Sequence, residues 1–423
     1  MSRAGASTTL IGILARRREA RPPGGECGTL PPRIAHPGGE VRIVVNCVPQ
    51  AGHILPLLPL AEAFAAQGDD VVVASGPDAA PAVAGHGLAF RATGPSFDEW
   101  FAALRARTRG IPGDGLAPAR IEAYFVPRLF GEVGTALVLD DLLALCREVE
   151  PDLVVFDPYA FAAPLAAAAT GARGVMHAIG ALMDRGVLDL AADAVSPMWR
   201  ELGMDAAPWA GVHAGTTLTI CPTSLDHGAD GLERARPLRP SPLPLPDPPA
   251  LPVSWDDPGR PLVYVTLGTF SNNAVDLFRL VLDALADEPV NVLATIGRDN
   301  DPAALGPVPG NARVEQFVPQ AAVLPHCAAV VHHAGAGTMF GLLAHGLPSV
   351  ALPQSADNFT VAELIAEAGV ARRLLPGEVT ADAVRSHLRT VLGDASYATR
   401  ARQVAEEIAA MPSPQDVAAA LRQ

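Results

Sequence analysis

The stretch Val-Val-His-His-Ala-Gly-Ala-Gly-Thr at positions 330–338 decides how this chain folds and where it binds a ligand. Its valines continue an apolar run from residue 328, which predicts a buried strand that ends at His332. The next residues have little side-chain bulk and lead into a segment of helix-forming composition, 339–344. Such a turn leaves backbone N–H groups free at the positive end of the helix dipole, where a phosphate is favoured. We therefore expect an anion site here.

Two glycines at such a turn more often only relieve steric strain, so the neighbouring residues decide the interpretation. His333 can donate to a phosphate oxygen, and Thr338 offers a hydroxyl in the first helical turn. Asp357 and Asn358 follow a second apolar run, 348–352, at its C-terminal end. In a parallel sheet, neighbouring strand ends share one crevice. A phosphate site beside a carboxylate and an amide predicts a ligand with an anionic half and a polyol half, which is a nucleotide sugar.

Three motifs follow one another in this half of the chain: Phe-Val-Pro-Gln (317–320), His-His-Ala-Gly-Ala-Gly-Thr (332–338) and Pro-Gln-Ser-Ala-Asp-Asn (353–358). In this order and spacing they resemble the donor-binding signature of the inverting, UDP-glycosyltransferase-type family. The resemblance is greatest to the bacterial branch that glycosylates macrolides, enediynes, glycopeptides and other natural products, and it extends over nearly all of the chain from Val41 onward. It implies a GT-B fold: two facing doubly wound, Rossmann-like α/β domains with a Pro-rich linker and a C-terminal crossover helix.

The beginning of the domain pattern supports a doubly wound fold independently. An apolar strand over Val41–Val48, a helix over Ile54–Gln67 and a strand over Val71–Ala74 form a strand-helix-strand unit. The unit lacks the Gly-x-Gly-x-x-Gly of dinucleotide oxidoreductases, which counts against a hydride-transfer enzyme.

His53 is the candidate general base, at the turn between the first strand and its helix. In the family that this chain resembles, the histidine of a Gly-His-x-x-Pro turn has this role, and residues 52–56 carry the motif. An imidazole can accept a proton from a hydroxyl near neutral pH. The alternative is a histidine at a helix N-terminus that is bonded only to backbone.

Asp157 ends an apolar strand over 152–156, where it is well placed to bond the far ring nitrogen of His53, and mainly the resemblance makes it the candidate partner of that histidine. The alternative is a capping role for the helix that we expect over 159–170.

The resemblance also implies the donor site. Gly268 and Thr269 would lie against the diphosphate, Val318 at the nucleotide base, and Gln320 at the ribose. The Asp-Asn-Asp turn at 299–301 matches a metal-holding pattern of another transferase fold, but Gly and Pro bracket it and we interpret it as a solvated turn. The predicted donor-binding residues are Gly268, Thr269, Val318, Gln320, His333, Gly335, Ala336, Gly337, Thr338, Asp357 and Asn358.

Two positions depart from the family pattern. Asn358 stands where Gln is usual and is one methylene shorter, which changes its reach to the sugar and favours a deoxysugar donor. Ala334 replaces a frequent Gly, which is tolerated unless this position has a positive φ.

Composition excludes several function classes. The formal net charge is −14 and the pI near 5.2, which argues against nucleic acid or an anionic membrane as main partner. All 31 basic residues are Arg, so lysine Schiff-base chemistry and a lysine-dependent phosphate loop are excluded. The five Cys are scattered and imply neither a disulfide framework nor a zinc site, so we expect a cytoplasmic protein. No apolar run approaches the ~20 residues of a membrane span.

The expected organisation has five parts. Residues 1–40 form a leader with little to bury, and one hypothesis is that translation starts at Val41 from a GUG codon. The remaining parts are an acceptor-binding domain (41–236), a Pro-rich linker (237–261), a donor-binding domain (262–410) and a C-terminal helix that packs back on the first domain (411–423).

The function that the resemblance implies, together with these residues, is an inverting glycosyltransferase with His53 and Asp157 as catalytic residues. It would move a sugar from a TDP- or UDP-sugar to a hydroxyl of a small hydrophobic natural product, without cofactor or metal. A homodimer is left open. One alternative is a nucleotide-sugar epimerase or phosphorylase of the same fold, and the other is a non-catalytic nucleotide-sugar-binding protein.

Overall fold

The computed structural model describes residues 40–108, 116, 118–225, 228–241, 250–251, 253–268, 275–298, 300–354 and 357–423. The predicted leader up to residue 39, the site residue Thr269, and Asp299 of the Asp-Asn-Asp turn lie outside these residues, as do 242–249 and 252 of the predicted linker. In the described part of the chain, no helix combines the length and the apolar character needed to cross a membrane.

A seven-stranded parallel sheet forms the centre of the first domain, in the order β3-β2-β1-β4-β5-β6-β7. Its strands are β1 (Arg42–Asn46), β2 (Asp70–Ser75), β3 (Ala89–Ala92), β4 (Leu153–Phe156), β5 (Arg173–His177), β6 (Thr216–Thr219) and β7 (Ala235–Pro237). Its helices are α2 (Ala51–Ile54), α3 (Leu58–Ala66), α4 (Ala80–Ala84), α5 (Phe97–Thr108), α6 (Pro118–Phe125), the π-helix η3 (Val126–Gly134), α7 (Thr135–Val149), α8 (Ala162–Thr170) and α9 (Arg185–Glu201), with 3₁₀ turns η2 (Pro77–Ala79) and η4 (Pro208–Gly211).

The second domain repeats the arrangement with six parallel strands in the order β10-β9-β8-β11-β12-β13. Its strands are β8 (Leu262–Thr266), β9 (Asn291–Thr295), β10 (Ala312–Glu315), β11 (Cys327–His332), β12 (Ser349–Ala351) and β13 (Ala371–Arg373). Its helices are α10 (Val275–Leu285), α11 (Gln320–Val323), α12 (Ala336–Ala344), α13 (Asn358–Glu367), α14 (Ala381–Gly393) and α15 (Ala395–Ala410), with 3₁₀ turns η5 (Pro302–Leu305), η6 (Leu324–His326) and η7 (Pro376–Glu378).

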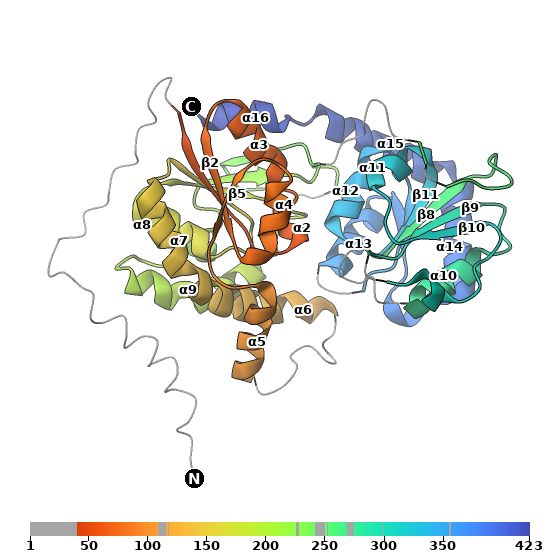
Figure 1. Ribbon diagram of the computed structural model, residues 1–423, viewed down its shortest axis with the longest axis horizontal. Coiled ribbons are helices and arrows are strands. Elements are labelled where there is room, and N and C mark those ends of the chain that lie inside the picture. Colours follow the sequence, from red (N-terminus) through yellow and green to blue (C-terminus); the bar gives the residue numbers. More distant parts are fainter. Residues whose placement is uncertain are drawn as a thin grey trace, which may run out of the picture.

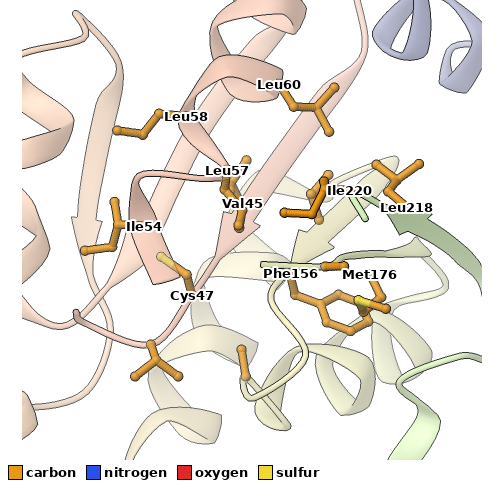
Figure 2. Packing of buried hydrophobic residues seen from close by; sticks show 14 of the residues in the cluster. Val45, Cys47, Ile54, Leu57, Leu58, Leu60, Phe156, Met176, Leu218 and Ile220 are labelled. Atoms are coloured by element: carbon orange, nitrogen blue, oxygen red, sulfur yellow. The ribbon is translucent and has the colours of Figure 1, made fainter. Parts of the chain in front are cut away.

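Both strand orders place the topological switch point between the first and fourth strands, β1/β4 and β8/β11. Ligands of open α/β sheets bind outside the carboxyl ends of the strands at this point. Apolar central strands such as β1 are covered on both faces, as expected for parallel strands. Figure 2 shows how Val45, Phe156, Met176 and Leu218, from four strands, belong to the same core as Leu60 of α3.

The chain ends on the first domain. Helix α16 (Pro414–Leu421) lies beside α3, whereas α15 lies over the second domain (Figure 1). Gln67 donates to the Gln415 carbonyl at 3.0 Å, and Arg422 donates to the Gln67 carbonyl at 3.0 Å. The last helix therefore links the two domains a second time.

The helix predicted over Ile54–Gln67 is wrong as one element, because the structure has α2 and α3 separated by a turn at residues 55–57. Pro56 and Pro59 have no N–H to donate, so the helical bonds to the carbonyls of residues 52 and 55 are missing, and the turn is closed by a tighter bond from the Leu57 N–H to the Ile54 carbonyl. This break gives His53 a short helix of its own.

Candidate active site

His53 and Asp157 lie at the carboxyl ends of β1 and β4, which pair with Asn46 opposite Phe156. The Nδ1 atom of His53 is 3.2 Å from Oδ1 of Asp157, whose side chain is fully buried. The same carboxylate accepts the N–H of Val48 on Oδ2 and the N–H of Tyr159 on Oδ1, each at 2.8 Å. These backbone bonds fix the carboxylate, which in turn orients the imidazole.

The alternative role of Asp157 was to cap the next helix, and the structure shows that it caps a turn before that helix instead. Its bond to the Tyr159 N–H closes a turn, but α8 begins at Ala162 after Phe161 as N-cap.

Two aromatic rings hold the His53 imidazole in place. Phe130 is stacked on it at 6.1 Å between ring centroids, and Tyr159 meets it edge-on at 5.2 Å. The His53 side chain keeps 13% of its surface exposed, so a substrate hydroxyl can reach it. Phe130 belongs to the π-helix η3, a rare conformation that often occurs at functional sites. Neither ring was among the predicted site residues.

The loop at 333–338 has the form expected of an anion site. β11 ends at His332, and α12 begins at Ala336 with Gly335 as its N-cap and no side chain capping it. The first N–H groups of a helix have no partner within the helix. Gly337 in this turn is exposed, and a Cβ there would meet no atom within 4 Å. These donors are therefore open to a ligand.

The His333 ring is packed against Gly268 and Gly335, which follow the adjacent strands β8 and β11. A Cβ at Gly268 would lie 2.3 Å from the His333 ring, and a Cβ at Gly335 equally close. Burial lowers the pKa of His333 to about 4, against the effect of a backbone hydrogen bond at Thr266. Its Nδ1 has no hydrogen-bond partner among the described residues. His333 is thus a neutral ring with a single N–H, which can be directed either to the backbone at Thr266 or to a phosphate oxygen, and the ring brings no charge to the site.

The preceding histidine shapes the loop from inside. His332 is fully buried, accepts the Ala334 N–H on Nδ1 at 3.1 Å, and donates through Nε2 to Ser349, also at 3.1 Å. Burial, and to a lesser extent the neighbouring His333, lowers the pKa of His332 to about 3. Ala334 itself has φ of +65°, so the position that usually carries Gly has a left-handed backbone here.

We expect Ala334→Gly to raise the free energy of unfolding by roughly 0.5–1 kcal/mol, because a left-handed conformation costs a residue with a Cβ more than it costs glycine. Urea or thermal unfolding measures the change. Ala166→Gly is the control, since it lies inside α8 with ordinary helical neighbours and should lose about 1 kcal/mol. A loss of stability in both variants would contradict the explanation.

One of the residues predicted to hold the nucleotide is hydrogen-bonded to the loop at 333–338. Gln320 donates through Nε2 to the Thr338 hydroxyl at 3.1 Å, and Val318 is buried. The Thr338 hydroxyl accepts this bond and can therefore still donate its own proton to a ligand. Phe317 is 48% exposed, with the Arg298 guanidinium 3.6 Å from its ring centroid. Thr338 therefore keeps its hydroxyl proton for a ligand at this place.

The Asp-Asn-Asp turn is bonded to its own backbone where the structure describes it. Asn300 donates to the Ile296 carbonyl at 2.6 Å, and Asp301 accepts the N–H of Ala303 at 2.9 Å. This is the arrangement expected of a turn.

Asp357 brings the two domains' candidate residues together. Burial raises its pKa, and attraction to His53 of the first domain opposes that rise. Asn358, the first residue of α13, is 6% exposed, and its Nδ2 lies 3.4 Å from Oδ1 of Asp357. The sugar-binding candidates therefore lie opposite the candidate base.

Known proteins match this chain along most of its length. Residues 118–230 and 279–423 match the N-terminal and C-terminal domains of "Erythromycin biosynthesis protein CIII-like". L-demethylnoviosyl transferase of Streptomyces niveus is 30% identical over 390 residues, 90% of this chain and 97% of that protein. The chain belongs to the EryCIII-like family of natural-product glycosyltransferases.

Two further comparisons agree with this membership. Demethyllactenocin mycarosyltransferase of Streptomyces fradiae is 31% identical to this EryCIII-like glycosyltransferase over 90% of the chain and 83% of the relative. The crystal structure of glycosyltransferase VinC in complex with dTDP is 27% identical, with a TM-score of 0.73 over 90% of this chain and 98% of that one. The predicted two-domain GT-B fold is confirmed.

Proposed function

We propose that this glycosyltransferase inverts the anomeric centre and moves a deoxysugar from a TDP- or UDP-sugar to a hydroxyl of a small hydrophobic natural product. The contact between His53 and Asp157, with Asp357 of the other domain beside them, is the observation that carries the proposal. The relatives named for mycarosyl and demethylnoviosyl transfer, and the dTDP complex, support a deoxysugar on a thymidine nucleotide.

The reaction that this geometry supports is one displacement. His53 takes the proton of the acceptor hydroxyl, and the oxygen forms a bond to the anomeric carbon as the bond from that carbon to the diphosphate oxygen breaks on the opposite face. The nucleoside diphosphate leaves with the electron pair, and the N–H groups at the start of α12, His333 and the Thr338 hydroxyl stabilise its charge. No metal or cofactor has a step in this scheme.

The test is to incubate the protein with TDP-rhamnose, TDP-6-deoxyglucose and UDP-glucose, each with and without a panel of aglycones, and to follow products by mass spectrometry and NMR. Sugar transfer that needs an acceptor, inverts the anomeric configuration and persists in EDTA would support the proposal. Donor turnover without an acceptor would favour the epimerase or phosphorylase alternative. Retained configuration, or loss of activity in EDTA, would contradict the mechanism.

We expect Gly268→Ala to weaken binding of dTDP about 10- to 100-fold, the worth of one hydrogen bond to a charged group. The new Cβ would fall 2.3 Å from the His333 ring, and Gly268 has φ of +72°, so the loop and the ring must both move. Calorimetric titration with dTDP and UDP measures the loss. Gly310→Ala is the control, since a Cβ there meets nothing within 4 Å. Unchanged affinity in Gly268→Ala would remove His333 from the phosphate site.

A further inference from the structure

Gln320 makes a contact that its predicted place at the ribose does not explain. It is the first residue of α11, and its Nε2 atom donates to the hydroxyl of Thr338 at 3.1 Å. Thr338 belongs to the first turn of α12, where the proposed reaction places the diphosphate. The polar end of Gln320 is therefore bonded to a residue of the phosphate site.

Helix α12 leaves room for this amide one turn further along. Gly341 lies three residues after Thr338, so the two residues share one face of the helix. A Cβ at Gly341 would lie 3.2 Å from Oε1 of Gln320, so the amide would have to shift. Glycine lowers the stability of a helix interior relative to alanine, and this close approach is a physical reason for glycine here. Both polar atoms of the Gln320 amide thus lie against α12.

The backbone that carries Gln320 is fixed by the core. Val318 before it, and Ala322 and Val323 after it, are buried in the same cluster as Phe340 of α12. Gln320 itself is half-buried. A side chain held on such a fixed segment keeps its hydrogen bond at a small further cost in entropy.

The hydrogen bond from Gln320 restricts what the Thr338 hydroxyl can do. A hydroxyl has one proton to donate and two lone pairs that accept, and Gln320 occupies one lone pair. A threonine inside a helix commonly donates to the carbonyl four residues earlier, as Thr170 does to Ala166 at 2.8 Å. In the described part of the chain no acceptor takes the Thr338 proton, although this side chain is 6% exposed. Phosphate oxygens only accept hydrogen bonds, so a hydroxyl held as a donor is matched to them.

We propose that Gln320 is a positioning residue of the donor site, which holds the Thr338 hydroxyl with its proton directed at the diphosphate and acts on the phosphates rather than on the ribose. The inference rests on the proposed function, because it takes the ligand at α12 to be a nucleoside diphosphate. It assigns Gln320 a different role within that function from the one that the resemblance implies.

The test compares a ligand that has the diphosphate with one that lacks it. Calorimetry gives the dissociation constant of dTDP, and competition against dTDP gives that of thymidine. In Gln320→Met, which keeps the length of the side chain and removes its donor, dTDP should bind about 2- to 10-fold more weakly, the worth of ordering one side chain. Thymidine should bind as before. Equal weakening of both ligands would mean that Gln320 contacts the nucleoside, and would overturn the inference.

A double-mutant cycle with Thr338→Val shows whether Gln320 acts through the hydroxyl. Thr338→Val alone should weaken dTDP about 10- to 100-fold, the worth of a hydrogen bond to a charged group. Adding Gln320→Met to Thr338→Val should cause no further loss, because the group that Gln320 positions is already gone. A further loss of the same factor as in the single variant would overturn the inference, since a direct contact or a general loosening of the loop persists without the hydroxyl.

Gln403→Met is the matched control, because Gln403 is an exposed glutamine of α15 and should leave both dissociation constants unchanged. Gln320→Asn replaces Gln320→Met if that variant does not fold, since its amide is one methylene too short to reach Thr338, and the same results are expected. Failure of the proposed transferase function would appear as no turnover with any donor. Failure of this inference would appear as equal losses for dTDP and thymidine in a protein that still transfers a sugar.

Discussion

Turnover in His53→Ala is expected to fall by about 10²- to 10⁴-fold, while the dissociation constant for dTDP changes little. The imidazole is the group placed to take the acceptor proton, because Asp157 engages its Nδ1 and leaves Nε2 without a proton. The diphosphate would bind at α12 in the other domain, so removing His53 does not touch it. Product formation under saturating substrate gives kcat, and calorimetry with dTDP gives the binding constant.

His86→Ala is the matched control for this experiment. His86 is also paired with a carboxylate, Glu62 at 2.7 Å, but its side chain is 36% exposed and belongs to no candidate site. It should keep full turnover. If His53→Ala also turns over near the wild-type rate, His53 is not the base.

The strands that hold the site were predictable because they are buried on both faces. The run over 328–331 and the first strand are rich in Val, and the structure places β11 and β1 within one or two residues of the prediction. Edge strands carry a weaker signal. β3 has the sequence Ala-Phe-Arg-Ala and is largely exposed, and β7 is a three-residue strand that ends in proline, so neither was predicted.

His53 and Asp157 were paired from the sequence mainly by the resemblance. The structure gives the physical reason, since both residues follow strands that are neighbours at the switch point. Phe130 could not be found in this way. It lies on the π-helix η3, whose place over the imidazole depends on packing against the surrounding helices rather than on any periodicity. From the sequence, Ala334 could be said to be unfavourable only if its φ is positive. The backbone of the structure shows that this φ is +65°.

Asp157→Asn is expected to lower turnover by about 10²- to 10⁴-fold and to reduce the free energy of unfolding by about 1–3 kcal/mol. Both carboxylate oxygens accept backbone N–H groups, Val48 on one and Tyr159 on the other. An asparagine must turn its NH₂ toward one of them, so two donors meet in a fully buried place. If the NH₂ takes the Oδ1 position it also donates to His53 Nδ1, which moves the ring proton to Nε2 and leaves no base.

Asp152→Asn separates the two effects, because Asp152 precedes the same strand at its other end and its Oδ2 accepts the Arg42 N–H at 2.9 Å. That variant should lose some stability and keep its turnover, whereas Asp157→Asn should lose turnover even at temperatures where it remains folded. The pH dependence of kcat distinguishes a tautomer effect from unfolding, since a ring held as Nε2–H does not regain activity at any pH at which the protein is folded. Turnover within tenfold of wild type in folded Asp157→Asn would mean that the carboxylate serves only the two backbone bonds and does not position the imidazole.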